Sequence, residues 1–439
     1  MYRNEFEKLY VNFQAEEIAQ PKVDVGDRLR IDWDMFDHLR VSSDSERIIS
    51  KGEAIQDVRD LFLLLKYAYS GFEYYSMDTD FERLEDKLTQ ELENNLFSNI
   101  SSVDLCSFLY TELSPYINDG HVWVEYASFE GLFLKTYIPF VTDLVVQKVQ
   151  EQFIVVKGNE SYNSGVSLQR EDIRGDLFPT LIPGCANECY LIGCYAMQDP
   201  GYIEVSGHHC RTHMLECCNV GPSVKDPYAL VEETKYAVFS NPTYQIYEDC
   251  NLHERNFRDA GRICAAKDFV IWDLTNNHGG NSVYPEVYLR ALNEYVHDEM
   301  DTAVLKSPIV GNSSAKKFYC YQEAPAFDNS NASYDGHLYI VMNKGTGSSA
   351  ELAVLFANSC KKVRKIGSPS AGVGLFGEVR SYRLQNSGIL VGLPYKVFYE
   401  DGFEIGKGYL PDYWIDDENP SAYLLKCLGE CKDCYREIL

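Results

Sequence analysis

The sequence predicts an α/β protein made of an N-terminal helical region, a β-rich middle segment and an α/β core with a mostly parallel sheet. Three successive patterns along the chain lead to this expectation. Apolar residues first recur at spacings of three and four, which is typical of amphipathic helices. Short β-rich runs follow, and in the last part strand and helix patterns alternate. We therefore expect three domains, with the boundaries 1–118, 119–245 and 246–439.

The helical region contains two amphipathic patterns. Each is an apolar stripe with polar residues between its members. The residues of the two stripes are Ile55, Val58, Phe62, Leu65 and Tyr69, and then Phe81, Leu84 and Leu88. Thr79 with Glu82, and Ser102 before the apolar run VDLCSFLY, are expected as helix N-caps.

The middle segment is expected to be mainly β-structure. Runs such as HVWVEY, DLVVQKV, QFIVVKG, CYLIGCYAM and YIEVSG are separated by Gly, Asn, Pro and Asp. His121 begins the first of these runs, so the middle segment carries this histidine.

The core repeats a pattern of a buried strand followed by a glycine-rich loop. The strands DFVIWDL, HLYIVMN and VRKIG lead into TNNHGGN, KGTGSS and SPSAGVG. Helix patterns follow the first two loops, and Pro285 stands in the first turn of one of them. Because ligands of open α/β sheets bind at the carboxyl ends of the strands, we expect NNHGGN and GTGSS to lie at one edge.

Composition restricts the function classes. The chain has 439 residues, with 40 Lys and Arg against 66 Asp and Glu, and a formal net charge of −26. Such a surface repels nucleic-acid phosphates and anionic lipids, so we expect neither as a partner. The N-terminus MYRNEFEKLYVNFQAEE lacks an apolar signal-peptide core, and no apolar run has the length of a membrane span. These observations predict a cytoplasmic protein.

The two adjacent serines in KGTGSSAE allow two interpretations. A serine between a strand and a helix can be a nucleophile, because the N–H groups at the helix N-terminus can stabilise an oxyanion. Serine is equally common there as a simple helix cap. The spacing differs from the G-x-S-x-G pattern of a nucleophile elbow, so the loop alone leaves Ser348 and Ser349 open to both interpretations.

Six motifs in the same order resemble the C-terminal processing (tail-specific) serine peptidase family. This family includes the tricorn protease core and the retinoid-binding protein repeats. The motifs are NDGHVWV, VIWDLTNNHGGN, NKGTGSSAELAVLFANS, IGSPSAGVGLFGE, LQNSGILVGLPYKVF and GKGYLPDYWI, within residues 115–425. The resemblance implies a ClpP/crotonase-like core, a peptide or unfolded-protein substrate, and no metal or other cofactor. It also allows a homo-oligomer.

The resemblance implies a nucleophile and an oxyanion hole. The family nucleophile lies three residues before a glutamate, which is Glu351 here, so Ser348 is the expected nucleophile. Ser349 would contribute its backbone N–H to the oxyanion hole, and Gly279 or Gly280 would contribute the second donor. Glu351 itself is expected to be structural, in the first turn of its helix.

The base is expected to be a histidine. Processing peptidases take a lysine from the glycine-rich loop, but SPSAGVGLFGE contains none, and Lys365 and Lys396 lie outside it. Tricorn-like members use a histidine from the motif that DGHVWV matches, which implies His121 as the base. The orienting acid is expected to be Glu404, with Glu400 and Asp401 as alternatives.

A second interpretation is a non-catalytic protein that binds peptides or apolar ligands on the same scaffold. It is favoured by Gly120, where tricorn-type members carry a serine, and by Ile405, where the family glutamate is expected. Ser348 and His121 favour the peptidase, because a binding scaffold needs neither.

Fourteen cysteines suggest a third and weaker interpretation, a zinc site. Zinc sites use paired C-x2-C knuckles, and only Cys431 and Cys434 have this spacing. The other clustered candidates are Cys185, Cys189, Cys194, His208, His209, Cys210, His213, Cys217, Cys218 and Cys427. We expect reduced structural thiols rather than a metal site.

Overall fold

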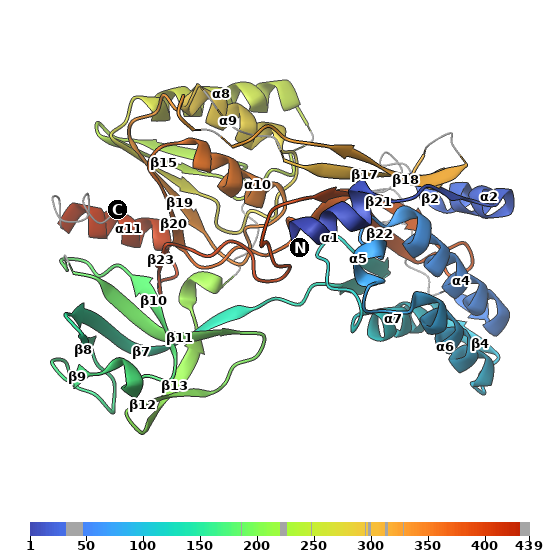
Figure 1. Ribbon diagram of the computed structural model, residues 1–439, viewed down its shortest axis with the longest axis horizontal. Helices are drawn as coiled ribbons and strands as arrows, with labels where there is room; N and C mark the ends of the chain where they lie inside the picture. Colours follow the sequence, from blue (N-terminus) through green and yellow to red (C-terminus); the bar gives the residue numbers. More distant parts are fainter. Residues whose placement is uncertain are drawn as a thin grey trace. The chain divides into compact units, whose positions relative to one another are not determined.

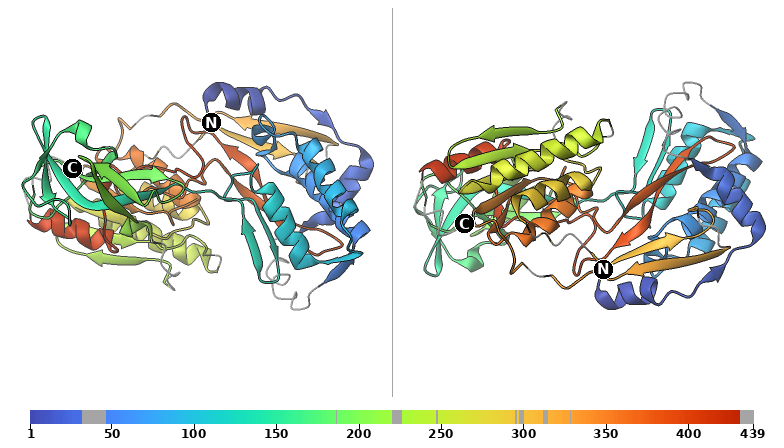
Figure 2. Two further views of the ribbon diagram at one scale, coloured as in Figure 1. Left: turned by 90° about the horizontal axis from the view of Figure 1, so that it is seen from below. Right: turned by 90° about the horizontal axis from the view of Figure 1, so that it is seen from above.

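The computed structural model describes residues 1–31, 47–185, 187–219, 226–246, 248–294, 296, 300–311, 315–327 and 329–430. The chain forms two compact units, shown in Figures 1 and 2. The first unit comprises Met1–Lys135, Glu299–Pro325 and Val373–Gly406. The second comprises Thr136–Asp298, Ala326–Gly372 and Lys407–Leu439.

These units differ from the three consecutive segments expected from the sequence. Residues 299–325 and 373–406 lie within the segment expected to form one core, yet they belong to the first unit. The reason is strand pairing, because both stretches supply strands to the sheet on which the N-terminal helices pack. Local periodicity carries no information about such long-range pairing.

The described residues of the first unit form an antiparallel sheet of eight strands. Six of them pair in the order β1 (Glu16–Glu17), β18 (Lys316–Gln322), β17 (Thr302–Lys306), β22 (Leu390–Phe398), β21 (Phe376–Arg383) and β2 (Arg30–Ile31). The other two are β5 (Trp123–Tyr126), which pairs with β22, and β6 (Phe129–Leu132), which pairs with β5. A separate hairpin joins β3 (Ile48–Ser50) and β4 (Asn99–Ser101).

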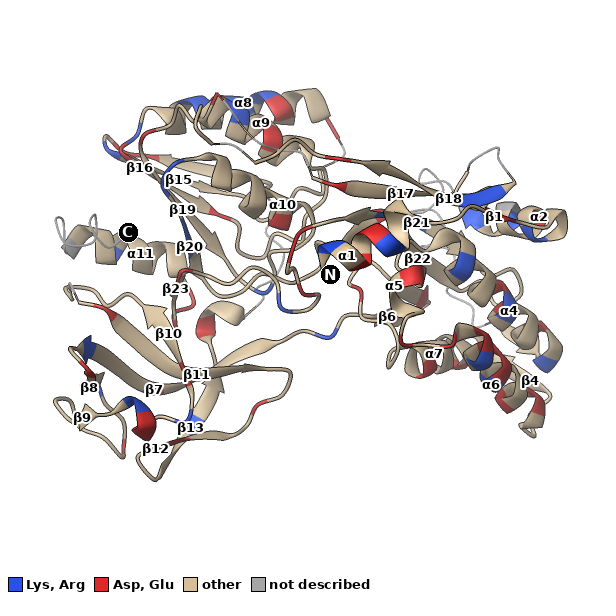
Figure 3. Cartoon of the chain, viewed as in Figure 1, with Lys and Arg blue, Asp and Glu red and all other residues tan. Residues whose placement is uncertain are grey.

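The helices in the described part of the first unit are α1 (Arg3–Phe6), α2 (Gln20–Leu29), α4 (Lys51–Ala68), α5 (Phe72–Tyr75), α6 (Phe81–Asn94) and α7 (Ser102–Leu113). The predicted stripes of α4 and α6 pack into one apolar core with residues of β17 and β22. The predicted caps are one residue off, because Asp80 and Ser101 occupy the N-cap positions and accept hydrogen bonds from the backbones of Arg83 and Asp104. Acidic side chains are prominent on α6 and α7 (Figure 3).

The second unit contains the larger sheet, and its centre is parallel as predicted. Parallel pairs join β15 (Tyr236–Ser240), β16 (Phe269–Asp273), β19 (His337–Met342), β20 (Val363–Gly367), β23 (Tyr413–Trp414) and β10 (Asp176–Thr180) in that order. β14 (Ala229–Glu232) adds an antiparallel edge beside β15. Beyond β10 the sheet continues antiparallel through β11 (Cys189–Ala196), β7 (Ile138–Val149), β13 (His208–Met214) and β12 (Tyr202–Val205). β8 (Gln152–Lys157) pairs with β7, and β9 (Ser167–Leu168) pairs with β8.

Helices cover both faces of the parallel strands. α8 (Cys250–Ala265), α9 (Val283–Leu292) and α10 (Ser349–Phe356) lie on one side, and α11 (Pro420–Glu430) lies on the other (Figure 1). Trp272 of β16 packs against Tyr288 of α9 with ring centroids 4.6 Å apart. Alternate residues on the same strands, such as Ile271, pack with Leu424 of α11. This helix-covered parallel sheet confirms the predicted α/β core.

Candidate active site

The loop between β19 and α10 presents Ser348 at the carboxyl end of the parallel sheet. Neighbouring loop residues hold it in place. The N–H of Gly347 donates to the carbonyl of Asn277 at 2.9 Å, and Thr346 Oγ1 donates to the carbonyl of Leu274 at 2.8 Å. Both acceptors lie in the loop after β16, so the two glycine-rich loops meet at one sheet edge, as predicted.

Ser348 has a strained backbone. Its φ of 55° and ψ of −122° place a residue with a Cβ in the region that normally suits glycine. Such conformations cost about 1–3 kcal/mol and occur mainly at functional sites. Although Ser348 occupies the N-cap position of α10, its side chain makes no capping hydrogen bond. The geometry therefore fits a strained strand-to-helix turn and not a simple cap.

Ser349 is engaged differently. Its Oγ donates to the carbonyl of Gly280 at 2.6 Å, and the side chain is almost fully buried. Its backbone N–H stands at the first position of α10, where no acceptor exists within the helix. Ser349 is thus suited to supply an N–H group, while its hydroxyl fastens the glycine loop.

Two glycines lie beside Ser348, with different hydrogen bonding. The N–H of Gly279 donates to Asn277 Oδ1 at 2.9 Å. Within the described part of the chain, no acceptor is recorded for the N–H of Gly280. A Cβ on Gly279 would stand 2.7 Å from Ser348 Cβ and 2.8 Å from the nitrogen of Ser349. Gly279 therefore gives the loop room to approach, and Gly280 is the better candidate for the second oxyanion donor.

Glu351 links α10 to the glycine-rich loop after β20. The buried carboxylate accepts hydrogen bonds from Ser370 Oγ at 2.5 Å and from the N–H of Gly372 at 2.8 Å. Glu351 thus fixes the loop in which Ser-Lys members of the family carry their base.

His121 lies in the first unit, just before β5, and a buried carboxylate lies two residues before it. Asp119 Oδ1 accepts the backbone N–H of His121 at 2.8 Å and lies 3.9 Å from His121 Nδ1. The hydroxyl of Tyr69 donates to Asp119 Oδ2 at 2.8 Å. Asp119 was not among the acids considered from the sequence. Its position two residues before the histidine was the available signal, but only the fold shows that it is buried beside the ring.

Burial shifts the pKa values of His121 and Asp119 in opposite directions. It lowers the pKa of His121 to about 4, although a backbone hydrogen bond with Val373 favours the protonated ring. Burial raises the pKa of Asp119 to about 6, against the hydrogen bonds from His121 and Tyr69. Near neutral pH the imidazole is therefore neutral and the carboxylate is ionised. This is the pair of states that a general base and its supporting acid require.

The structure also explains the glycine before His121. A Cβ on Gly120 would stand 2.3 Å from Cγ1 of Val373, so the valine fills the space that a serine side chain would need. Glu404, also in the first unit, is exposed and directly follows the buried Phe403.

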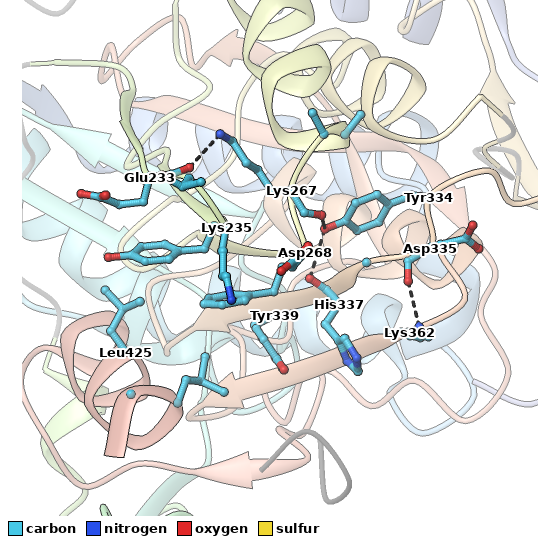
Figure 4. A pocket seen from close by; sticks show the side chains of 18 of the residues that line it. Glu233, Lys235, Lys267, Asp268, Tyr334, Asp335, His337, Tyr339, Lys362 and Leu425 are labelled. Carbon is cyan, nitrogen blue, oxygen red and sulfur yellow. Dashed lines mark hydrogen bonds between the residues drawn. The ribbon is translucent and has the colours of Figure 1, made fainter. Parts of the chain in front are cut away.

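A pocket of about 1200 Å³ lies in the second unit at the opposite edge of the parallel sheet (Figure 4). Its lining includes Tyr236, Phe269 and His337, which begin strands β15, β16 and β19. Ser348 follows the other end of β19. This pocket is therefore separate from the predicted catalytic edge.

The described cysteines do not assemble into a metal site with other ligands. Among the described residues, no group of three or more His, Cys, Asp or Glu side chains is arranged to hold a metal ion. Cys185 and Cys189 come close to each other, with their sulfur atoms 3.6 Å apart. Cys431 and Cys434 lie outside the described residues.

Both the sequence and the fold of this chain are similar to those of known peptidases. Residues 253–415 match the family model described as peptidase family S41. The fold resembles mature CPAF, with a TM-score of 0.50, 13% identity, and coverage of 88% of this chain and 98% of that chain. CPAF complexed with lactacystin gives the same TM-score at 12% identity, covering 88% and 99%. The comparison with curated proteins gives no match.

A further likeness to the tricorn protease is weaker. Its TM-score is 0.41 at 13% identity, with coverage of 88% of this chain and 37% of that chain. None of the helices in the described residues has the length and apolar character needed to cross a membrane.

Proposed function

We propose that the chain is a serine peptidase of family S41, whose model matches residues 253–415, with Ser348 as the nucleophile and His121 as the general base. In this mechanism His121 takes the proton from Ser348 Oγ as the hydroxyl attacks the peptide carbonyl. The N–H groups of Ser349 and Gly280 stabilise the oxyanion, and His121 then protonates the leaving amine.

The conformation of Ser348 carries the proposal. A strained serine at a strand-to-helix turn, whose side chain does not cap the helix that follows it, is the arrangement expected of a nucleophile and not of a helix cap. The alternative of a non-catalytic binding protein explains neither this strain nor the N–H groups beside it. The family match likewise favours the peptidase.

Two carboxylates are candidates for the acid that supports His121. The resemblance to tricorn-type members points to Glu404. The short distance in the first unit favours Asp119, which is buried and lies 3.9 Å from the imidazole. We propose Asp119 as the stronger candidate, because an exposed carboxylate such as Glu404 is weakened by solvent screening.

Peptides and unfolded C-termini are the proposed substrates, and the cytoplasm is the proposed location. The preference for C-termini rests on the resemblance to tail-specific peptidases. The location rests on the cysteine-rich composition and on thiols such as Cys106 and Cys264. These side chains are buried in the core, where burial raises their pKa and leaves them as unreactive thiols.

A fluorophosphonate probe tests the nucleophile directly. Intact-mass measurement should show one adduct per chain, and peptide mapping should place it on Ser348. Ser348→Ala should abolish the adduct, while Ser349→Ala should retain it. An adduct that persists in Ser348→Ala and is lost in Ser349→Ala would reverse the assignment.

A further inference from the structure

Lys344 places a half-buried cation in the loop that leads to Ser348. Its Nζ donates to the carbonyl of Ser370 at 2.6 Å, to the carbonyl of Lys407 at 3.3 Å and to Tyr195 Oη at 3.4 Å. The ammonium also lies 5.8 Å from the centre of the Tyr195 ring. Its N–H groups thus meet oxygen atoms from three separate segments of the second unit, which satisfies the three donors of an ammonium group.

Ser370 is the junction of this arrangement. Its N–H donates to the carbonyl of Tyr409 at 3.1 Å, and the N–H of Tyr409 donates back to Ser370 Oγ at 2.8 Å. The same Oγ donates to Glu351. Gly408 lies so close that a Cβ would stand 2.4 Å from Ser370 Oγ. The glycine-rich loop is therefore held from one side by α10 and from the other by Lys344 and the segment 407–409.

We propose that Lys344 is a positioning residue of the catalytic site, whose ammonium fixes the loop 368–372 and the segment 407–409 against the loop that carries Ser348. This inference rests on the proposed role of Ser348 as the nucleophile. The loop 368–372 is also joined directly to the serine loop, because the N–H of Ala371 donates to the carbonyl of Thr346 at 2.8 Å. A displacement of the glycine-rich loop would therefore move Thr346, which lies two residues before Ser348.

The charge of Lys344 determines the direction in which activity should change with pH. Burial lowers the pKa of Lys344 to about 8, against the opposing influence of Glu351 and Cys218. The Cys218 thiol stays protonated in this range, because burial raises its pKa to about 12. Tyr195, whose hydroxyl accepts a hydrogen bond from the ammonium, is a further titratable group beside it. Above pH 8 Lys344 loses one donor and its charge, so a positioning role predicts falling activity. A general base would instead give rising activity over the same range.

The test compares Lys344→Met and Lys344→Arg with the wild type, with Lys365→Met on β20 as the matched control. Fluorophosphonate labelling rates, kcat and KM for a peptide substrate are measured from pH 6 to pH 10. We expect the wild-type kcat to fall above about pH 8. Lys344→Met should lower kcat and the labelling rate about a hundredfold with little change in KM, as a small displacement of catalytic groups does. Lys344→Arg should recover part of the loss and abolish the fall, because its guanidinium stays charged.

Lys344→Met labelled at the wild-type rate would overturn the inference, and so would wild-type activity that rises through pH 8. Circular dichroism melting shows whether Lys344→Met folds. If it does not fold, the pH profiles of the wild type and Lys344→Arg decide. A wild type that is never labelled refutes the proposed nucleophile, and the inference falls with it. A labelled wild type with an unaffected Lys344→Met refutes the inference alone.

Discussion

Gly279 lies against Ser348 so closely that a Cβ on the glycine would stand 2.7 Å from the Cβ of the serine. This separation is shorter than any ordinary contact between carbon atoms. Gly279 also has a φ of +90°, a conformation that residues with side chains rarely adopt. The loop after β16 is therefore required to carry glycine where it passes the serine.

Gly279→Ala should lower kcat/KM at least a hundredfold, because either Ser348 or the N–H of Ser349 must move. Gly165→Ala is the matched control: its φ is +92°, but nothing lies within 4 Å of its added Cβ. Both variants carry the same backbone strain, and only Gly279→Ala crowds the serine. Equal activity of the two variants would show that the close approach has no catalytic role.

Ser348→Gly should be more stable than Ser348→Ala, although both should be inactive. Glycine relieves the cost of the positive φ, about 1–3 kcal/mol, and alanine retains it. The greater entropy of glycine in the unfolded chain offsets about 0.5–1 kcal/mol of this gain. We expect a net difference of about 1 kcal/mol in the free energy of unfolding, measured by urea titration. A more stable Ser348→Ala would mean that the backbone is relaxed.

Asp119→Asn should lower kcat/KM about a hundredfold, and Glu404→Gln should have a smaller effect. Asparagine can still accept the backbone N–H of His121, so the change removes mainly the negative charge. Two unit charges about 4 Å apart interact by roughly 4 kcal/mol at an effective dielectric constant of 20, enough for this loss. A larger loss in Glu404→Gln would return the supporting role to Glu404.

The sequence predicted the parts of the site that depend on local pattern. Ser348 and Ser349 follow a strand and precede a helix, and the structure places them beside Gly279 and Gly280 at the expected sheet edge. The hydrogen bond that occupies the Gly279 N–H could not be predicted, because it depends on the conformation of Asn277.

Asp119 and Lys344 were missed for a related reason. Both lie in motifs on which the resemblance rests, but the resemblance assigns a role to neither, and their roles depend on burial and on partners far away in the sequence. Tyr69 is 50 residues from Asp119, and Lys407 is 63 residues from Lys344. The first-unit sheet was missed likewise, because it joins β5 near residue 125 to β22 near residue 391.

The pH dependence of kcat/KM separates a histidine base from a lysine base. His121 must be neutral to accept the proton of Ser348 Oγ, and burial lowers its pKa from the ordinary value of 6.5 to about 4. Since a lowered pKa keeps the ring neutral to lower pH, activity should begin to rise well below pH 6.5. It should be level from about pH 7, where Asp119 is also largely ionised, until the fall expected above about pH 8. Asp119→Asn should remove the part of this rise that lies near pH 6, because the amide that replaces the carboxylate does not ionise. His121→Ala should lower kcat by several orders of magnitude, and Lys365→Ala and Lys396→Ala should retain activity. Near-native activity of His121→Ala, together with an inactive lysine variant, would rule out the Ser-His mechanism.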